Sequence, residues 1–454
     1  CQQWSRIYRR ERGLFLSWPQ RDRVEELLDN AVGDLDVDVV VVTDGERVLG
    51  LGDLGIGGMG IPVGKLALYT AGGGLDPSRT LPVMLDVGTD NDALLSDPLY
   101  LGWRHQRVRG AEYDELVDAF VDALGKRFPD VMLQWEDFAQ LHANRLLARH
   151  RDRICSFNDD IQGTAAVSVA AIVAGLGTAG TPVGDLRLVV VGAGSAGTGI
   201  ASQAVRAMVA AGVSEHDAER RCWLVDRDGL LHDRMQGLAS FQQPFARPWD
   251  EIADWDDDGD GVVELLDVVS RVGPHALVGV TGQPGIFTES IIRAQAAHVA
   301  QPIVLPLSNP TPRAEAIPAD VLAWTDGAAL IGTGSPFAPV DVGGHSIPIA
   351  QVNNVHVFPG VGLGVVAVKA RAVSDEMLTA AATAIGRLAA ENQDGGILPP
   401  VTESRRVARH VAFAVARTAV DQGHAPSMND DEIAARIDEA SWSPVYRDLD
   451  DHVR

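Results

Sequence analysis

The chain has 454 residues, of which 46% are hydrophobic and 22% charged, a composition typical of a soluble globular protein with more than one domain. Its 38 basic and 62 acidic side chains give a formal net charge of −24, which disfavours non-specific binding to nucleic acid or anionic membranes. Three cysteines cannot form a disulfide framework and match no zinc-site spacing, so we expect a reducing, cytoplasmic setting. No apolar run reaches the length of a membrane span, and we see no signal-peptide pattern.

The first third of the chain alternates predicted strands and helices. Residues 37–42, 81–87 and 131–134 are apolar runs typical of buried strands. Between the last two, the helical spacing of apolar residues predicts an amphipathic helix over 113–127. Residues 163–176 predict a helix of small apolar residues that is too short for a bilayer and that we expect to be buried.

The middle of the chain predicts a doubly wound parallel sheet, because strands and helices alternate there. A strand over 186–191 is followed by a glycine-rich turn over 192–199 and a helix over 200–211. Further strands are predicted at 222–225, 276–280, 303–305 and 328–331. Residues 373–420 are alanine-rich and helical, and a polar, acidic tail begins at Asp421.

The turn after the strand over 186–191 carries a dinucleotide fingerprint. It consists of Gly192, Ala193, Gly194, Ser195, Ala196 and Gly197. The three glycines allow the tight turn, the approach of backbone to a pyrophosphate, and close helix–strand packing. Asp226 ends the next strand, where an acidic residue accepts ribose hydroxyls, although it lies further along than is usual. The alternative is a structural glycine turn in another α/β fold.

Four carboxylates follow two predicted strands. Glu136 and Asp137 end one of them, and Asp159 and Asp160 follow Asn158. Such a set suits a hard divalent cation such as Mg²⁺ or Mn²⁺. On spacing alone, helix caps or solvated strand ends are the more common explanation of such acid pairs.

A glycine-rich segment over residues 50–64 precedes Lys65, one of only three lysines. It lacks the phosphate-loop form because Leu66 follows the lysine. One interpretation is tight packing of turns. The other is a rigid, desolvated loop that lowers the pKa of Lys65, as a general base requires.

Residues 256–267 fit a calcium-loop pattern, with acids at positions 1, 3 and 5, a glycine at 6 and Asp267 at 12. We favour an acidic surface turn at this place.

Six segments occur in the order found in malic enzymes. They are residues 43–47 with the glycine loop to Lys65, and residues 134–138, 157–164, 192–197, 307–311 and 351–354. The sequence resembles this family from Cys1 to about Arg417, and most closely its large bacterial NAD-type members.

The resemblance implies oxidative decarboxylation of (S)-malate to pyruvate and CO₂, with reduction of NAD and a required Mg²⁺ or Mn²⁺. It implies that Glu136, Asp137 and Asp160 ligate the metal. Lys65 would be the base that takes the hydroxyl proton, and Asp159 would interact with it.

The same resemblance implies the substrate contacts. Arg47 would clamp a carboxylate of malate, and Asn309 and Asn354 would be uncharged donors to malate. Asn354 would also reach the cofactor, which the fingerprint and Asp226 would hold. We expect NAD rather than NADP because Asp226 repels a 2′-phosphate, although Arg227 beside it weakens that argument.

One family feature is absent from this sequence. The family protonates the enolate carbon with a tyrosine in a Tyr-Thr-Pro motif, which should come just before the segment that begins at Cys1. We interpret Tyr8 and Tyr69 as packing residues. We therefore expect a form that starts at Cys1 to be nearly inactive, and the native gene to encode a further segment with this motif.

These observations predict a multidomain α/β protein with a malate-binding lobe and a Rossmann-like, doubly wound NAD-binding domain, and an active site in the cleft between them. We expect the malate and metal domain over 1–158, the NAD domain over 159–348, a return crossing over 349–420 and an acidic tail over 421–454. The expected partner is malate, without nucleic acid or membrane, in a homodimer or homotetramer. The alternatives are a malolactic enzyme, which keeps its NAD and releases lactate, and a catalytically impaired fragment.

Overall fold

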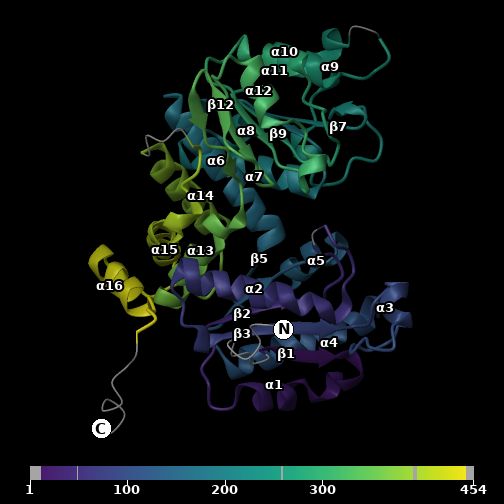
Figure 1. The fold of residues 1–454 in the computed structure, drawn as a ribbon, viewed down its shortest axis with the longest axis vertical. Coiled ribbons are helices and arrows are strands. Elements are labelled where there is room, and N and C mark those ends of the chain that lie inside the picture. Colours follow the sequence, from purple (N-terminus) through teal and green to yellow (C-terminus); the bar gives the residue numbers. More distant parts are fainter. Residues whose placement is uncertain (1–11, 49, 257–258, 392–395, 446–454) are drawn as a thin grey trace. The chain divides into compact units, whose positions relative to one another are not determined.

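The structure, a computed structural model, describes residues 12–48, 50–256, 259–391 and 396–445, and it divides into two compact units (Figure 1). Unit 1 takes in the described residues up to Asn158, together with Gly362–Val373 and those from Ala419 onward. Unit 2 comprises Asp159–Val361 and Ser374–Thr418. The division into four segments stays a prediction.

Unit 1 is built on a five-stranded, fully parallel sheet with the order β1-β3-β2-β4-β5. Its strands are β1 (Leu14–Ser17), β2 (Val39–Thr43), β3 (Thr80–Asp86), β4 (Met132–Trp135) and β5 (Ser156–Asn158). Strands β2, β3 and β4 are buried along their whole length, as expected for the interior of a parallel sheet covered on both faces. The three strands predicted from apolar runs are therefore confirmed, with their ends shifted by one or two residues.

Helices accompany the sheet of unit 1 in the sequence. They are α1 (Val24–Val32), α2 (Gly60–Leu68), α3 (Asp92–Ser96), α4 (Gly110–Arg127), α5 (Gln140–His150) and α16 (Asp430–Ala440). In α4, the apolar stripe that includes Leu116, Phe120 and Leu124 is buried, as its spacing predicts. Helix α16 is a difference from the expected acidic tail. Asn429 and Glu432 form a capping box at its start, and Ile433 and Ile437 are buried.

Unit 2 contains a seven-stranded sheet with the order β14-β11-β10-β9-β6-β7-β8. The strands are β6 (Leu188–Val191), β7 (Cys222–Asp226), β8 (Gly229–Leu230), β9 (Ala276–Gly279), β10 (Ile303–Pro306), β11 (Leu330–Thr333) and β14 (Ala350–Gln351), with a separate hairpin of β12 (Val340–Val342) and β13 (His345–Ile347). Within the seven-stranded sheet, every pair of neighbouring strands is parallel except β7 with β8. The predicted doubly wound sheet is confirmed, because β7 and β9 flank β6 on opposite sides.

Helices pack around this sheet. Those within unit 2 are α6 (Thr164–Thr178), α7 (Ser195–Ala210), α8 (Glu215–Glu219), α9 (Trp249–Ile252), α10 (Leu265–Val272), α11 (Glu289–Ala296), α12 (Pro318–Trp324) and α14 (Asp375–Ala390). Helices α13 (Phe358–Val368) and α15 (Ser404–Asp421) run across the boundary between the units.

Helix α6 corrects one expectation. The helical stretch Asp159–Thr178 is 20 residues long and apolar enough to cross a membrane, so the expectation that it is too short is wrong. It is, however, a core helix of unit 2. Of its most apolar 18-residue stretch, 72% is buried, and helices α14 and α7 pack against it. The expected burial of this helix is confirmed.

Candidate active site

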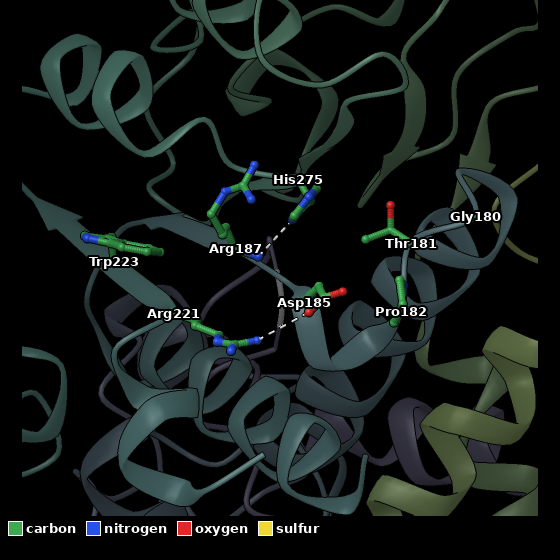
Figure 2. Close-up of a pocket in the computed structure, with 8 residues that line it drawn as sticks. All are labelled: Gly180, Thr181, Pro182, Asp185, Arg187, Arg221, Trp223 and His275. Carbon is green, nitrogen blue, oxygen red and sulfur yellow. Dashed lines mark hydrogen bonds and ion pairs between the residues drawn. The ribbon is translucent and has the colours of Figure 1, made fainter. Parts of the chain in front are cut away.

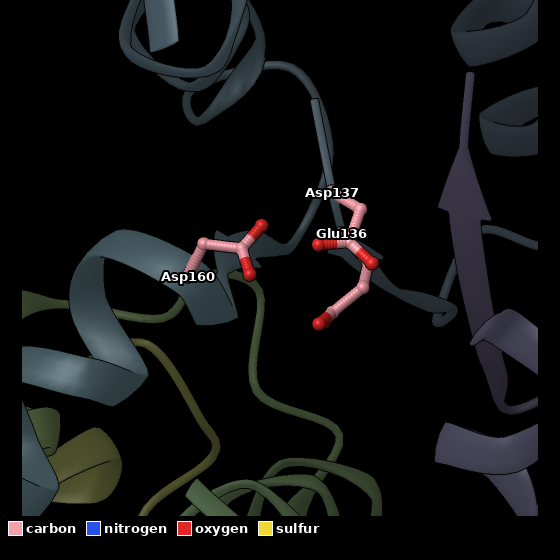
Figure 3. Close-up of side chains that lie close together, drawn as sticks. All are labelled: Glu136, Asp137 and Asp160. Atoms are coloured by element: carbon pink, nitrogen blue, oxygen red, sulfur yellow. The ribbon is translucent and has the colours of Figure 1, made fainter. Parts of the chain in front are cut away.

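Acidic side chains gather at the carboxyl ends of β4 and β5. The two strands pair in parallel with Trp135 beside Asn158, so the residues that follow each strand emerge at the same sheet edge. Glu136 and Asp137 follow β4, and the chain continues from β5 into Asp159 and Asp160. Figure 3 shows the Asp160 carboxylate facing those of Glu136 and Asp137, and one ligand atom from each of the three lies within 4.8 Å of the others.

This carboxylate cluster fits a hard divalent cation. Glu136 and Asp137 are buried, and carboxylates so close together repel one another unless positive charge lies among them. Asp137 also has a left-handed backbone with φ of 55°, a conformation that aspartate tolerates and that is concentrated at functional sites. An all-oxygen donor set of three carboxylates is what Mg²⁺ or Mn²⁺ prefers.

Lys65 lies beside this cluster. Its Nζ is 2.9 Å from Oε1 of Glu136, and its side chain is 19% exposed. Lys65 belongs to α2 rather than to a loop, which corrects the expected loop geometry. Two of the glycines before it are tightly packed: a Cβ on Gly58 would lie 2.7 Å from Cα of Gly45, and one on Gly55 would lie 2.0 Å from the Tyr100 hydroxyl. Gly50, Gly52, Gly60 and Gly64 have open space beside them, so the interpretation as tight packing holds for part of the segment.

A buried hydrogen-bond network holds Glu136 from the other side, and sequence reasoning did not find it. Gln134, the last but one residue of β4, donates from Nε2 to Oε2 of Glu136 at 2.6 Å. The fully buried Tyr69 donates its hydroxyl to Oε1 of Gln134 at 2.5 Å. The only signal was that Gln134 precedes Glu136 by two residues, which places both on one face of the extended chain.

Arg47 stands on the turn after β2. Its backbone N–H donates to the carbonyl of Asp137 at 3.2 Å, so the turn is tied to the acidic edge, and its side chain is exposed. The buried Asp44 fixes this turn. Its Oδ2 accepts a hydrogen bond from the Tyr113 hydroxyl at 2.8 Å, and its Oδ1 accepts one from the Glu46 N–H. Burial raises the pKa of Asp44 above its usual range.

The dinucleotide fingerprint lies at the carboxyl end of β6, in the predicted strand–turn–helix context. Gly192 has a φ of 101°, and a Cβ on Gly197 would lie 1.9 Å from the Gly192 carbonyl oxygen, so both positions require glycine. Gly194 is different, because a Cβ there would meet nothing within 4 Å. The open side of Gly194 lines a hollow of about 450 Å³, at the N-terminus of α7. Backbone N–H groups at such a position bind phosphate.

The carboxyl end of β7 borders this hollow, and a further contact fixes the fingerprint turn. Asp226, at the end of β7, lines it together with Arg227, whose side chain is 84% exposed. Gln242 donates from Nε2 to the Ala193 carbonyl at 2.9 Å and so fixes the fingerprint turn.

The two predicted asparagines have different surroundings. Asn354 donates from Nδ2 to the carbonyl of Asp159 at 2.9 Å and to Oδ2 of the same residue at 3.2 Å, so the structure joins these two site residues. Asn309 follows β10, and its Oδ1 accepts the hydroxyl of Ser335. Asp159 is buried and lies where a Cβ on Gly163 would collide with it, so glycine is required there.

A second hollow in unit 2, of about 600 Å³, lies at the amino ends of β6, β7 and β9 (Figure 2). Arg187 donates from Nη2 to the Gly273 carbonyl at 2.6 Å and from its backbone N–H to Nδ1 of His275 at 3.0 Å. Arg221 lies 3.9 Å from Asp185. These polar side chains are engaged in contacts that hold the strand ends together, at the sheet edge opposite the fingerprint.

In the segment that fits the calcium-loop pattern, the described residues make turn contacts. Asp256 accepts the backbone N–H groups of Gly259 and Gly261 at 2.7 and 2.8 Å, so its carboxylate oxygens are used within the turn. Residues 257 and 258 of this pattern lie outside the described residues.

The chain is similar to known proteins over nearly its whole length. The family model "Malic enzyme, N-terminal domain" matches residues 1–151, and "Malic enzyme, NAD binding domain" matches residues 161–420. The NAD-dependent malic enzymes of Vibrio campbellii and Shewanella woodyi are each 51% identical over 449 residues, which cover 98% of this chain and 80% of theirs.

Solved structures show the same likeness. The malic enzyme of Entamoeba histolytica has a TM-score of 0.66 at 25% identity, covering 93% of this chain and 78% of that one. The malic enzyme of Pyrococcus horikoshii, at 23% identity and a TM-score of 0.65 over 93% of this chain and 86% of its own, shares the fold. The chain belongs to the malic enzyme family.

Proposed function

We propose that this chain oxidises and decarboxylates (S)-malate to pyruvate and CO₂ with reduction of NAD, in the presence of Mg²⁺ or Mn²⁺. The observation that carries the proposal is the carboxylate cluster of Glu136, Asp137 and Asp160 with Lys65 beside it. The names of the relatives, NAD-dependent malic enzymes at about half identity over nearly the whole chain, support the same reaction.

In this proposal Glu136, Asp137 and Asp160 hold the metal. A metal held there would supply Lewis acidity next to the malate hydroxyl and to the oxygen that gains charge during loss of CO₂. Lys65, in its neutral form, takes the hydroxyl proton at Nζ, and Asp159 supplies a buried negative charge that favours the lysine once it is protonated. Tyr69 and Gln134 fix the orientation of Glu136.

The remaining site residues bind and orient. Arg47 clamps a malate carboxylate with its guanidinium, a geometry suited to two parallel hydrogen bonds. Asn309 and Asn354 donate uncharged hydrogen bonds to malate, and Asn354 also reaches the cofactor. The fingerprint Gly192–Gly197 cradles the pyrophosphate and Asp226 accepts the adenosine ribose hydroxyls. Bound NAD supplies the acceptor for the hydride that leaves C2 of malate.

The test is a product assay on the purified protein. With (S)-malate, NAD and Mn²⁺ we expect free NADH and pyruvate in equal amounts, and loss of turnover after chelation with EDTA that Mn²⁺ restores. Lactate without free NADH would indicate a malolactic enzyme instead. Turnover that persists in EDTA would contradict the role given to the carboxylate cluster.

We also propose a cytoplasmic homodimer or homotetramer. Cys155 and Cys222 are buried free thiols, as is usual for cysteines in a reducing compartment. Leu101 and Phe15 border an apolar hollow of about 670 Å³ in unit 1, and Leu101 is 90% exposed, as a subunit interface would require. Sedimentation equilibrium tests the assembly, and a strictly monomeric protein would contradict it.

A further inference from the structure

Glu315 is a fully buried carboxylate in unit 2 that accepts four hydrogen bonds. Its Oε1 accepts the Thr281 N–H at 2.8 Å, the Thr281 hydroxyl at 2.9 Å and the Ser308 hydroxyl at 2.5 Å. Its Oε2 accepts the Ser308 N–H at 3.2 Å. Burying a charge is costly unless hydrogen bonds compensate it, and these four donors do so.

The four donors come from two loops. Thr281 follows β9 and Ser308 follows β10, and these strands are neighbours in the sheet. Ser308 also accepts the Gly282 N–H at its Oγ, at 2.8 Å, so this hydroxyl relays the contact from one loop to the carboxylate. Glu315 packs closely on β9, because a Cβ on Gly279 would lie 2.5 Å from its Cγ. One carboxylate thus fixes the loops after β9 and β10 to each other.

The first of these loops borders the dinucleotide hollow. Val280 and Thr281 line it together with Gly192, Gly194 and Asp226. Asp226 ends β7, on one side of β6, whereas β9 and β10 lie on the other side. A dinucleotide spans the point where the strand order reverses, with its adenosine ribose at the acidic residue. The nicotinamide half therefore falls to the loops after β9 and β10, which Glu315 holds.

We propose that Glu315 is a positioning residue for the nicotinamide half of the dinucleotide, acting through Thr281 and Ser308. The inference rests on the proposed function, because it takes NAD as the ligand of the hollow. It gives Glu315 no contact with the reacting atoms. Ser308 immediately precedes Asn309, so the same carboxylate also fixes the start of the loop that carries a proposed malate contact.

The test compares two ligands on the variant Glu315→Gln, which keeps the shape of the side chain but turns one acceptor into a donor. NADH reports on the whole dinucleotide, and AMP reports on the adenosine half alone. We expect the Kd for NADH, measured by fluorescence titration, to rise roughly 10-fold, which is the effect of losing about one charge-assisted hydrogen bond. We expect the Kd for AMP, from calorimetry, to stay within twofold.

Two further variants make the result decisive. Ser308→Ala removes the relay while leaving the carboxylate, and it should weaken NADH binding without changing AMP binding, even if Glu315→Gln fails to fold. Glu289→Gln makes the same chemical change on the exposed face of α11, where Glu289 pairs with Arg293, and should alter neither ligand.

Each other outcome contradicts the inference. Unchanged NADH binding in the soluble variants overturns it, and an equal loss for NADH and AMP means that Glu315 serves only the stability of unit 2. A wild-type protein that binds AMP but not NADH would contradict the proposed function itself, and the inference with it.

Discussion

The carboxyl edges of the two parallel sheets are built from opposite kinds of residue. At the edge of β4 and β5 the chemistry lies in side chains: three carboxylates within 4.8 Å and a lysine 2.9 Å from one of them. At the edge of β6, β7 and β9 it lies in the backbone, where Gly192 and Gly197 allow the turn and Gly194 leaves its outer side open. The first edge presents fixed charge, and the second presents shape and N–H groups.

This difference predicts how each edge fails. At the edge of β4 and β5, removing a single carboxylate should weaken metal binding even if the shape of the protein is unchanged. At the edge of β6, β7 and β9, adding a single methyl group to the glycine turn should weaken dinucleotide binding even if every charged side chain remains. Substitutions at the two edges should therefore affect different ligands.

The largest effect is expected from Lys65→Ala at the charged edge. Loss of a general base lowers kcat by roughly 10²–10⁴-fold, because the amine that lies 2.9 Å from Glu136 and takes the malate hydroxyl proton in this account is gone. Steady-state kinetics with malate and NAD measure it. The matched control is Lys126→Ala, since Lys126 is 70% exposed and pairs with Glu25 on the surface. A Lys65→Ala enzyme within threefold of wild type would rule out this base.

The next effect concerns the cofactor, at the edge of β7. Wild-type protein should have a higher kcat/KM with NAD than with NADP, because the Asp226 carboxylate repels a 2′-phosphate. In Asp226→Ser that preference should fall by roughly 10-fold, since the repulsion is gone and Arg227 can pair with the phosphate. Asp250→Ser, at an exposed acid that pairs with Arg234 and does not line the hollow, should leave the preference unchanged. A clear advantage for NADP in wild type would contradict the assignment.

A smaller effect should follow Tyr69→Phe, which removes one hydroxyl from the network below Glu136. Gln134 then lacks its buried donor, which should cost about 1–3 kcal/mol of unfolding free energy and weaken Mn²⁺ binding severalfold. Tyr113→Phe is a matched control, because it deletes another buried tyrosine hydroxyl of unit 1, the one bound to Asp44. It should cost similar stability without the loss of Mn²⁺ affinity. Equal Mn²⁺ affinity in both variants would deny Tyr69 this role.

Elements with strong local patterns were predictable from the sequence. The valine-rich β2, the apolar stripe of α4 and the strand–glycine–helix unit around β6 each carry their own periodicity. The short strand β1 was not: it has only four residues and is defined by its pairing with β3. Helix α16 was missed because its apolar face is only Ile433 and Ile437 among acidic residues.

The candidate site shows the same limit. The carboxylates and the fingerprint stand next to strand ends in the sequence, so their grouping follows from parallel pairing. Contacts between distant segments leave no such trace. Tyr69 reaches Gln134 across 65 residues, and Glu315 reaches Thr281 across 34, and neither pair has a local pattern that indicates it. Tyr69 was interpreted as a packing residue, and its burial is confirmed, but its hydroxyl has a partner as well.

The most direct test of this difference between the two edges is to measure the affinities for Mn²⁺ and for NADH in one variant from each edge. Asp160→Ala should weaken Mn²⁺ binding by roughly 10-fold or more while NADH binding stays as in wild type. Gly194→Ala should do the reverse, weakening NADH roughly 10-fold with unchanged Mn²⁺ affinity, since its φ of −71° admits alanine and its outer side is open. Electron paramagnetic resonance for Mn²⁺ and fluorescence for NADH give the four dissociation constants. Unchanged Mn²⁺ affinity in Asp160→Ala, or unchanged NADH affinity in Gly194→Ala, would contradict the account.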